Sequence, residues 1–299
     1  MQKNIMRFAS LLIVTFIMAT LAGPVSVAQD DRGYWAPVEQ AMGKKGEVSP
    51  DGVVTFVIPR DLSVTLDGIR LAPGSDMSHE FSFMRTSEGT MMVGEIMLKE
   101  DEVAGVTQKL LAAGITETAL HNHLLRERPH IMWLHVHANG DPVPVAKALN
   151  NIITPLDGGP ATVSQHVPLS QLDTARLDAI IGLQGKAEDG VYAYSVPRAD
   201  KINMGGVELP PDMDISTRIS FQPTGQGKAA VIGEFVLEKS EVSPVLARLA
   251  DNGVEVTALH SHMINEQPRL FYMHCWAVGD PAVIAGAMRK ALDKTNSSV

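Results

Sequence analysis

The stretch GEIMLKEDEVAGVTQKLLAAGITETALHNHLLRERPHIMWLHVHANGDP, residues 94–142, recurs as GEFVLEKSEVSPVLARLADNGVEVTALHSHMINEQPRLFYMHCWAVGDP, residues 233–281. The two segments align without a gap at an offset of 139 residues, and 20 of the 49 aligned positions are identical. Repetition on this scale indicates that one structural unit has been duplicated. We therefore predict a chain built from two tandem copies of one domain.

The repeat extends upstream and sets the domain boundaries. Pro59-Arg60 corresponds to Pro197-Arg198. We predict a first repeat unit over residues 34–156 and a second over residues 172–294. Residues 157–171 contain Gly158, Gly159 and Pro160, and this composition is typical of a linker.

The hydrophobic pattern within each unit changes period several times. We predict strands over residues 53–58, 78–84, 91–98, 116–124 and 130–138, and over the corresponding stretches of the second unit. Between them, a helical spacing follows Asp101 and Ser240, which we expect to be N-caps, and ends at Gly114 and Gly253. A last helix begins at Asp141-Pro142 and at Asp280-Pro281. The predicted fold class is α+β: each copy is an antiparallel sheet with helices on one face, and a pseudo-twofold axis relates the two copies.

Most of the histidines gather on two predicted strands of each unit. Side chains alternate between the two faces of a strand, so His121, His123, His135 and His137 share one face of the first unit. We expect Leu120, Leu124, Met132, Leu134 and Val136 to pack on the helices from the opposite face. The second unit repeats the pattern with His260, His262 and His274, and has Trp276 in place of His137.

Two histidines on one strand and a third on its neighbour can converge on one divalent ion. Glu95 and Glu234 lie on a strand of the same sheet, and each is a candidate fourth ligand or a candidate catalytic base for a metal-bound water. Imidazole donors suit zinc, which we favour, and also copper. We expect the first copy to be the better site, because it also has His137 and the nearby His130 and His79, whereas the second has Arg269 near its histidines.

Two functions are compatible with this pattern. The first is a metal-binding protein, with metal-dependent hydrolysis as its candidate activity. The second is a non-enzymatic cell-envelope module in which the histidines are structural. Such a module would clasp a small molecule or glycan, stacking it on Trp133, His137, Tyr272 and Trp276. In either case, the aromatic rings on the histidine faces would be exposed in separate units, and this favours packing of the two faces against each other.

Composition excludes several other classes. The formal net charge is −9, and no run of Lys or Arg supplies the phosphate contacts of a nucleic-acid-binding protein. The single cysteine, Cys275, excludes an internal disulfide and a thiolate metal cage. Lys3, Arg7 and the apolar stretch after them predict a signal peptide over residues 1–28. We therefore expect a periplasmic or secreted protein with no membrane span after signal cleavage.

The strings ALHNH, ERP and LHVHANGDP, with their second copies, resemble the LppY/LpqO-like family of bacterial exported proteins, a domain of unknown function. The resemblance covers nearly the whole predicted mature chain. It implies export and a duplicated domain, and it implies no particular activity. The namesakes are lipoproteins, whereas this chain has no cysteine directly after its apolar stretch to carry a lipid.

Overall fold

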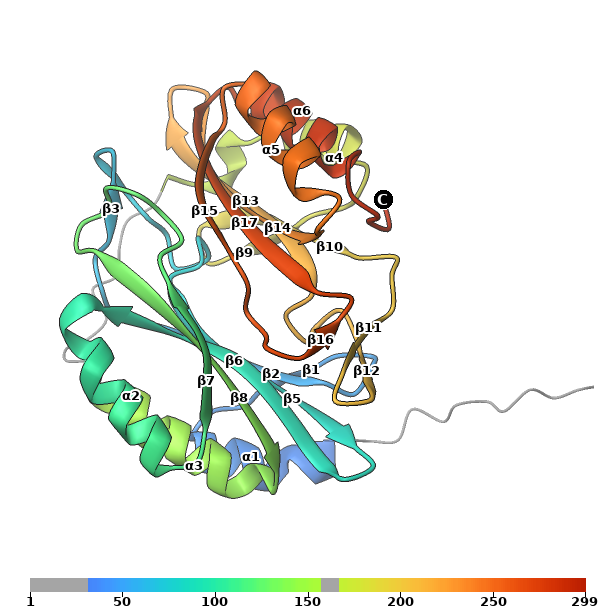
Figure 1. Ribbon diagram of the computed structural model, residues 1–299. Helices are drawn as coiled ribbons and strands as arrows, with labels where there is room; N and C mark the ends of the chain where they lie inside the picture. Colours follow the sequence, from blue (N-terminus) through green and yellow to red (C-terminus); the bar gives the residue numbers. More distant parts are fainter. Residues whose placement is uncertain (1–31, 157–166) are drawn as a thin grey trace, which may run out of the picture.

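The computed structural model describes residues 32–156 and 167–299. The predicted signal peptide and most of the predicted linker (residues 157–166) lie outside the described residues. The described chain forms two units of the same topology, and their two sheets face each other between two outer layers of helices (Figure 1). The predicted α+β class, with two tandem antiparallel sheets, is confirmed.

Each unit is organised around a six-stranded antiparallel sheet. The first sheet contains, in spatial order, β1 (Glu47–Val48), β2 (Val54–Pro59), β5 (Ser78–Thr86), β6 (Gly89–Lys99), β8 (Ile131–Gly140) and β7 (Thr116–His121). The second contains, in the matching order, β9 (Lys186–Glu188), β10 (Val191–Pro197), β13 (Ser216–Gly225), β14 (Lys228–Glu238), β17 (Leu270–Gly279) and β15 (Glu255–His260). The matching orders extend the sequence duplication to the topology.

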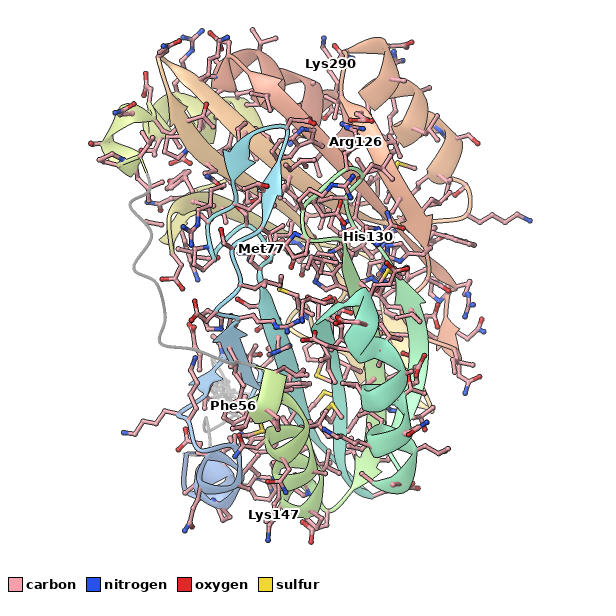
Figure 2. The ribbon with its side chains drawn as sticks, turned by 90° about the vertical axis from the view of Figure 1, so that its left-hand side faces the viewer. Phe56, Met77, Arg126, His130, Lys147 and Lys290 are labelled. Carbon is pink, nitrogen blue, oxygen red and sulfur yellow. The ribbon has the colours of Figure 1, made fainter. Side chains whose placement is uncertain are left out.

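Helices cover only the outer face of each sheet (Figure 1). The first unit has α1 (Arg32–Met42), α2 (Val103–Ala112) and α3 (Pro142–Ile153), and the second has α4 (Thr174–Ile181), α5 (Val242–Asp251) and α6 (Pro281–Leu292). Beneath them lie two separate cores, one around Phe56, Phe81 and Leu134 and one around Phe221 and Met273. In Figure 2, Lys147 on α3 and Lys290 on α6 mark opposite ends of the molecule.

The predicted helix ends are partly right. Asp141 and Asp280 cap α3 and α6 through side-chain oxygens that accept backbone N–H groups, as expected. Gly114 and Gly253 follow α2 and α5 with positive φ angles of 70° and 73°. Asp101 and Ser240 are not N-caps, because α2 and α5 begin one residue later than that prediction requires, after Glu102 and Glu241.

The strands β7 and β15 lie at the edges of their sheets, so side chains predicted to face the helices are less covered there than on central strands. Leu134 and Val136 pack on the helices, as predicted. Leu120 does not: it is 42% exposed, because the helical layer does not cover the edge strand there. Leu124 follows the end of β7 and packs between the two sheets instead.

Short arms from each unit reach across to the other unit's sheet. The first arm contains the hairpin of β3 (Thr65–Leu66) and β4 (Ile69–Arg70), and its Leu66 packs with Ile232 and Trp276 of the second sheet. The second arm contains β11 (Ile202–Met204) and β12 (Val207–Leu209), pairs with β16 (Glu266–Gln267), and packs on Met91 and Val93 of the first sheet. These exchanged arms bury apolar surface on both sides of the interface between the sheets.

The predicted packing of the two histidine faces is confirmed. The rings of His121 and His260 stack with their centroids 3.4 Å apart, although the residues belong to different units.

Among the helices of the described ranges, none has the length and apolarity needed to cross a membrane.

A buried arginine ties each arm to its own unit. The guanidinium of Arg60 donates to the Met97 carbonyl at 3.0 Å and to the Glu102 carboxylate at 2.6 Å. Arg198 donates in the same way to the Val236 carbonyl at 2.8 Å and to Glu241 at 2.7 Å. The same carboxylates accept the backbone N–H groups of residues 99 and 238. The pairing of both arginines with carboxylates agrees with the repeated Pro-Arg dipeptide having a structural role.

We expect Arg198→Ala to lower the free energy of unfolding by about 3–5 kcal/mol, because the buried Glu241 loses its main charge partner. Arg60→Ala should cost less, because Glu102 is partly exposed and keeps Lys99 Nζ at 3.3 Å. Urea unfolding followed by circular dichroism measures the change. Lys201→Ala is the control, since its pair with Glu208 is exposed and worth at most about 1 kcal/mol. A cost for Arg198→Ala no larger than that of the control would contradict this role.

Candidate metal centre

The interface between the sheets contains six histidines and four carboxylates. Strand pairing places two of the carboxylates, because Glu95 on β6 lies directly opposite His135 on β8, and Glu234 on β14 directly opposite His274 on β17. The remaining members come from β7, β15 and the loops that follow or precede the strands. The whole set, here called the histidine cluster, is His121, His123, His135, His260, His262, His274, Asp76, Glu95, Asp214 and Glu234.

The imidazole rings of the histidine cluster form three stacks that cross the interface. His121 stacks on His260, as described above. His123 lies between Trp133, at a centroid distance of 3.9 Å, and His274, at 3.8 Å. In the third stack, His262 lies between Tyr272, at 3.5 Å, and His135, at 3.6 Å. The pseudo-twofold axis exchanges the second and third stacks, so each contains rings from both units.

Two aspartates fix the orientation of the central imidazoles. Asp76 Oδ2 lies 2.6 Å from His123 Nδ1, and Asp214 Oδ2 lies 2.7 Å from His262 Nδ1. Both aspartates have left-handed backbones, with φ angles of 66° and 60°. Such angles are uncommon for residues other than glycine and are found preferentially at functional sites. A carboxylate on Nδ1 directs Nε2 toward a metal in many metalloproteins.

The Nε2 atom of every histidine in the cluster is buried and has no hydrogen-bond partner among the described residues. Both ring nitrogens of His260 and His274 are in this state. A buried polar atom without a partner costs about 1–3 kcal/mol, so native proteins seldom leave several together. The pattern therefore indicates a ligand that accepts these lone pairs.

The distances between the candidate donor atoms match those around a metal ion. Glu95 Oε2 lies 3.4 Å from His135 Nε2 and 4.0 Å from His123 Nε2. Bonds of about 2.1 Å in a tetrahedral arrangement place neighbouring donors about 3.4 Å apart. Within the described ranges, five sets of three or four side chains have donor atoms within 4.8 Å of one another, and all five sets belong to the histidine cluster.

Burial determines the protonation of the cluster. Loss of hydration lowers the pKa of His121 to about 4 and that of His260 to about 2, and lowers the pKa of His123 well below its ordinary value. The imidazoles are therefore neutral, which is the form that binds metals. Burial also raises the pKa of Asp76 to about 7 and that of Glu95 well above its usual range. A dication would offset this effect, since positive charge favours the carboxylate form.

Three further residues expected near the metal lie elsewhere. His79 faces its own unit, where its Nδ1 accepts the Met97 N–H at 3.1 Å, and Thr217 Oγ1 accepts the Val236 N–H in the second unit. His130 is on the outer surface near Glu100. Arg269 donates to the loop carbonyls of Met263 and Ile264, both at 3.0 Å, and to no ligand atom of the cluster. The predicted superiority of the first copy therefore loses the support of these three residues.

The ring-stacking surface expected of an envelope module is not available. Trp133 and Tyr272 are fully buried and already stack on histidines, and Trp276 is only 4% exposed. These rings cannot clasp a ligand, because the other unit covers them. His137 shares the histidine face, as predicted, but lies two residues beyond His135 and is not among the five donor sets.

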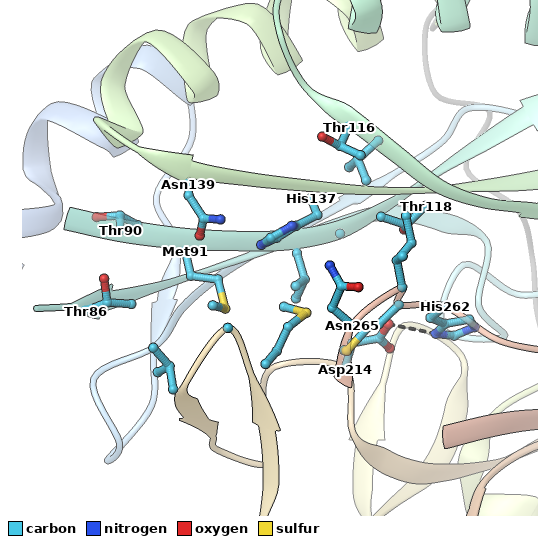
Figure 3. Close-up of a pocket in the computed structure, with 18 of the residues that line it drawn as sticks. Thr86, Thr90, Met91, Thr116, Thr118, His137, Asn139, Asp214, His262 and Asn265 are labelled. Carbon is cyan, nitrogen blue, oxygen red and sulfur yellow. Dashed lines mark hydrogen bonds and ion pairs between the residues drawn. The ribbon is translucent and has the colours of Figure 1, made fainter. Parts of the chain in front are cut away.

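His137 instead lines a cavity of about 660 Å³ beside the cluster. His135, Asp214 and His262 lie at the inner end of this cavity, and the exposed residues Ser87 and Glu88 lie at its outer end. Figure 3 shows Asn139, His137 and Thr118 along the first sheet, with Asn265 and Asp214 facing them from the second unit. The cavity connects the surface of the molecule with the histidine cluster.

Sequence reasoning missed Asp76 and Asp214, because both lie in loops outside the predicted strands. A signal was present: Asp76-Met77-Ser78 corresponds to Asp214-Ile215-Ser216 in the second unit. Because this aspartate stands two residues before the same serine in both copies, and both copies carry the histidine pattern, it was a candidate to orient a metal ligand.

The fold and the cluster together define a class of protein: a duplicated α+β protein whose histidine cluster lies at the interface between its repeats. The family described as Domain of Unknown Function (DUF1259) matches residues 36–154 and again residues 175–294. The chain therefore belongs to this family and carries two tandem copies of its domain.

The other comparisons add no argument about function. No curated protein matches the chain. A trimeric bacterial microcompartment shell protein, PduB, is 14% identical, with coverage of 83% of this chain and 88% of that one and a TM-score of 0.20. An unknown protein from Galdieria sulphuraria is 11% identical (68% and 88%, TM-score 0.17), and EutL from Clostridium perfringens 10% (84% and 94%, TM-score 0.18). At these TM-scores the likeness carries no structural inference.

The buried His79 generates a pH prediction. Burial lowers its pKa to about 3, so between about pH 6.5 and pH 3 the unfolded chain takes up a proton that the folded chain does not. The stability that neutral His79 contributes is complete above pH 6.5 and is lost as the pH falls, by about 1.4 kcal/mol per pH unit.

His79→Thr copies the arrangement of Thr217 and removes this titration. We expect the variant to be less stable at pH 7.5, because the smaller side chain leaves a cavity, and the gap to the parent chain to close by about 1.4 kcal/mol at pH 5.5. Urea unfolding at the two pH values measures the gap. A gap that does not change with pH would refute the assignment.

Proposed function

We propose that this protein is a metal-binding protein whose centre is the histidine cluster. Two of the donor sets share no residue and are related by the pseudo-twofold axis: Glu95, His123 and His135 for one ion, and Glu234, His262 and His274 for a second. His121 and His260 stack between the two sets and offer further Nε2 donors. The ligand residues predicted in each repeat thus contribute to one shared centre, and His137 lies beside it.

The observation that carries the proposal is the set of buried, unpaired Nε2 atoms. A purely structural histidine layer would pair these nitrogens with carboxylates or backbone groups, since hydrogen-bonded imidazoles are the norm in protein interiors. In the cluster, only the Nδ1 atoms of His123 and His262 have a carboxylate oxygen closer than 3 Å, at 2.6 and 2.7 Å. In metal sites, a histidine commonly binds the ion through one ring nitrogen while a carboxylate holds the other, and His123 and His262 are arranged in this way.

The donors favour a first-row transition ion, with zinc as the first choice and copper as the alternative. Imidazole and carboxylate donors suit zinc, whereas Cu(I) prefers sulfur. The chain's one thiol, Cys275, packs in the core beneath the helices, where burial raises its pKa to about 12. It takes no part in the centre.

The cavity supports metal-dependent hydrolysis as the activity of this centre. A bound dication lowers the pKa of a coordinated water toward neutrality. Glu95 and Glu234 are the groups that we assign to bind the ion or to hold the proton of that water. Asp214 and His262 lie where the cavity meets the cluster, so a substrate in the cavity would reach the ligands directly.

Export to the periplasm or beyond is part of the same proposal. It rests on the signal-peptide pattern of residues 1–28 and on the resemblance to the LppY/LpqO-like proteins. Fractionation of cells that express the full chain tests it.

Removal of ligands should remove metal. We expect His121→Ala/His123→Ala and His260→Ala/His262→Ala each to lose at least half of the metal bound by the parent chain, because each ligand set loses its oriented histidine. Metal is measured by mass spectrometry on untagged protein purified without chelator. His130→Ala is the matched control, since this histidine lies outside the cluster, and it should retain all the metal. If neither double variant changes the metal content while both lower the melting temperature, the histidines are structural.

The hydrolytic activity is tested separately with a neutral chromogenic ester, p-nitrophenyl acetate. We expect turnover by the zinc-loaded chain, loss of turnover on chelation, recovery on re-addition of zinc, and at least a 100-fold lower rate for Glu95→Gln. A rate that chelation does not change would contradict hydrolysis at this centre and leave the metal-binding proposal intact.

A further inference from the structure

The two sides of the pseudo-symmetric interface differ at four corresponding positions. On one side, Arg126 donates to the carboxylates of Glu255, at 2.7 and 2.8 Å, and Asp67, at 3.3 Å, and Trp276 Nε1 donates to Asp67 at 3.1 Å. This network, here called the latch, joins the loop and the arm of the first unit to the sheet of the second. Figure 2 shows Arg126 reaching toward the second unit.

The other side has a smaller or uncharged residue at each of these positions. Asn265 corresponds to Arg126, Thr116 to Glu255, His137 to Trp276 and Gly205 to Asp67. The turns themselves match, because Asp67 and Gly205 have φ angles of 50° and 61°. All four replacements line the cavity of about 660 Å³. The cavity therefore lies where the latch is missing.

We infer that this cavity is the substrate-binding site of the protein and that ligands reach the histidine cluster from this side, while the latch closes the opposite side. The inference rests on the proposed metal centre. His137 and Gly205 are then specificity-determining residues, because the side chains at these positions decide whether the space beside the cluster is open. Their counterparts, Trp276 and Asp67, fill the equivalent space.

The lining identifies the chemical class of ligand. None of the described residues that line the cavity is a lysine or arginine, whereas Glu88 and Asp214 contribute carboxylates. An anionic substrate would meet no fixed cation here apart from the metal itself. Hydroxyl and amide groups of Thr118 and Asn139 lie in the same lining as the apolar side chains of Met91 and Met263. A neutral small molecule with several hydroxyl or amide groups and one apolar face fits this lining, and the volume is in the usual range for such sites.

The test transfers the latch from one side to the other. The latched variant is Thr116→Glu/His137→Trp/Gly205→Asp/Asn265→Arg in the full zinc-loaded chain. Asp67 shows that an aspartate is accommodated in this turn. The probe is 1,10-phenanthroline, a neutral chelator, and the readout is the rate of zinc release. We expect unchanged zinc content and a release rate at least 10-fold lower than in the parent chain.

The matched control adds the reciprocal changes Asp67→Gly/Arg126→Asn/Glu255→Thr/Trp276→His to the latched variant. This opens the second side, and we expect it to restore fast release. Equal release rates in the parent and the latched variant, both with full zinc, would overturn the inference and leave the metal centre standing. A parent chain that binds no zinc or other first-row metal would overturn both.

A second chelator tests whether the cavity prefers neutral ligands. Dipicolinate, a planar chelator of similar size, carries two negative charges. We expect it to release zinc from the parent chain at least 10-fold more slowly than phenanthroline at concentrations of matched chelating strength. If dipicolinate is as fast as phenanthroline, and the latch slows it equally, the site takes anions and the assignment to neutral ligands is wrong.

Discussion

The structure depends on the packing of two histidine-bearing sheet faces against each other. Neither face could remain exposed without leaving its large rings in water, and neither could be covered by an ordinary apolar layer, because each presents buried ring nitrogens. Stacking of imidazole on imidazole buries the faces of the rings against each other, while the ring nitrogens stay at the edges of the stacks, where a ligand can bind them. The cluster is thus a product of the interface, and every stack needs rings from both units.

Much of this architecture follows from sequence. Strand alternation placed His121 and His135 on one face and Leu134 on the other, because successive side chains of a strand point to opposite faces. His123 joins them from the loop just after β7, which ends at His121. The helix caps at Asp141 and Asp280 follow from the Asp-Pro pairs. The repeat itself predicted that the two faces would meet, since a duplicated unit provides its own partner.

Other features could not be predicted in this way. The arms contain strands of only two or three residues, too short for any periodicity to register. Leu120 is exposed because the position of β7 at the sheet edge depends on strand order, which alternation does not encode. His79 was expected near the ligands because it belongs to the first unit's imidazoles, yet its ring faces its own unit, where it accepts the Met97 N–H. Asp76 and Asp214 act from loops, where no pattern specifies the direction of a side chain.

The crossed arms have a consequence for the origin of the chain. A single ancestral unit could have built the same interface with a second copy of itself, as a homodimer with an isologous contact. In such a dimer every residue occurs twice in equivalent surroundings, so both flanks of the cluster must be alike. Only after fusion into one polypeptide could Trp276 and His137, or Asp67 and Gly205, diverge. The difference between the side closed by the latch and the side open at the cavity could therefore arise only in the fused chain, because a symmetric homodimer has two identical sides.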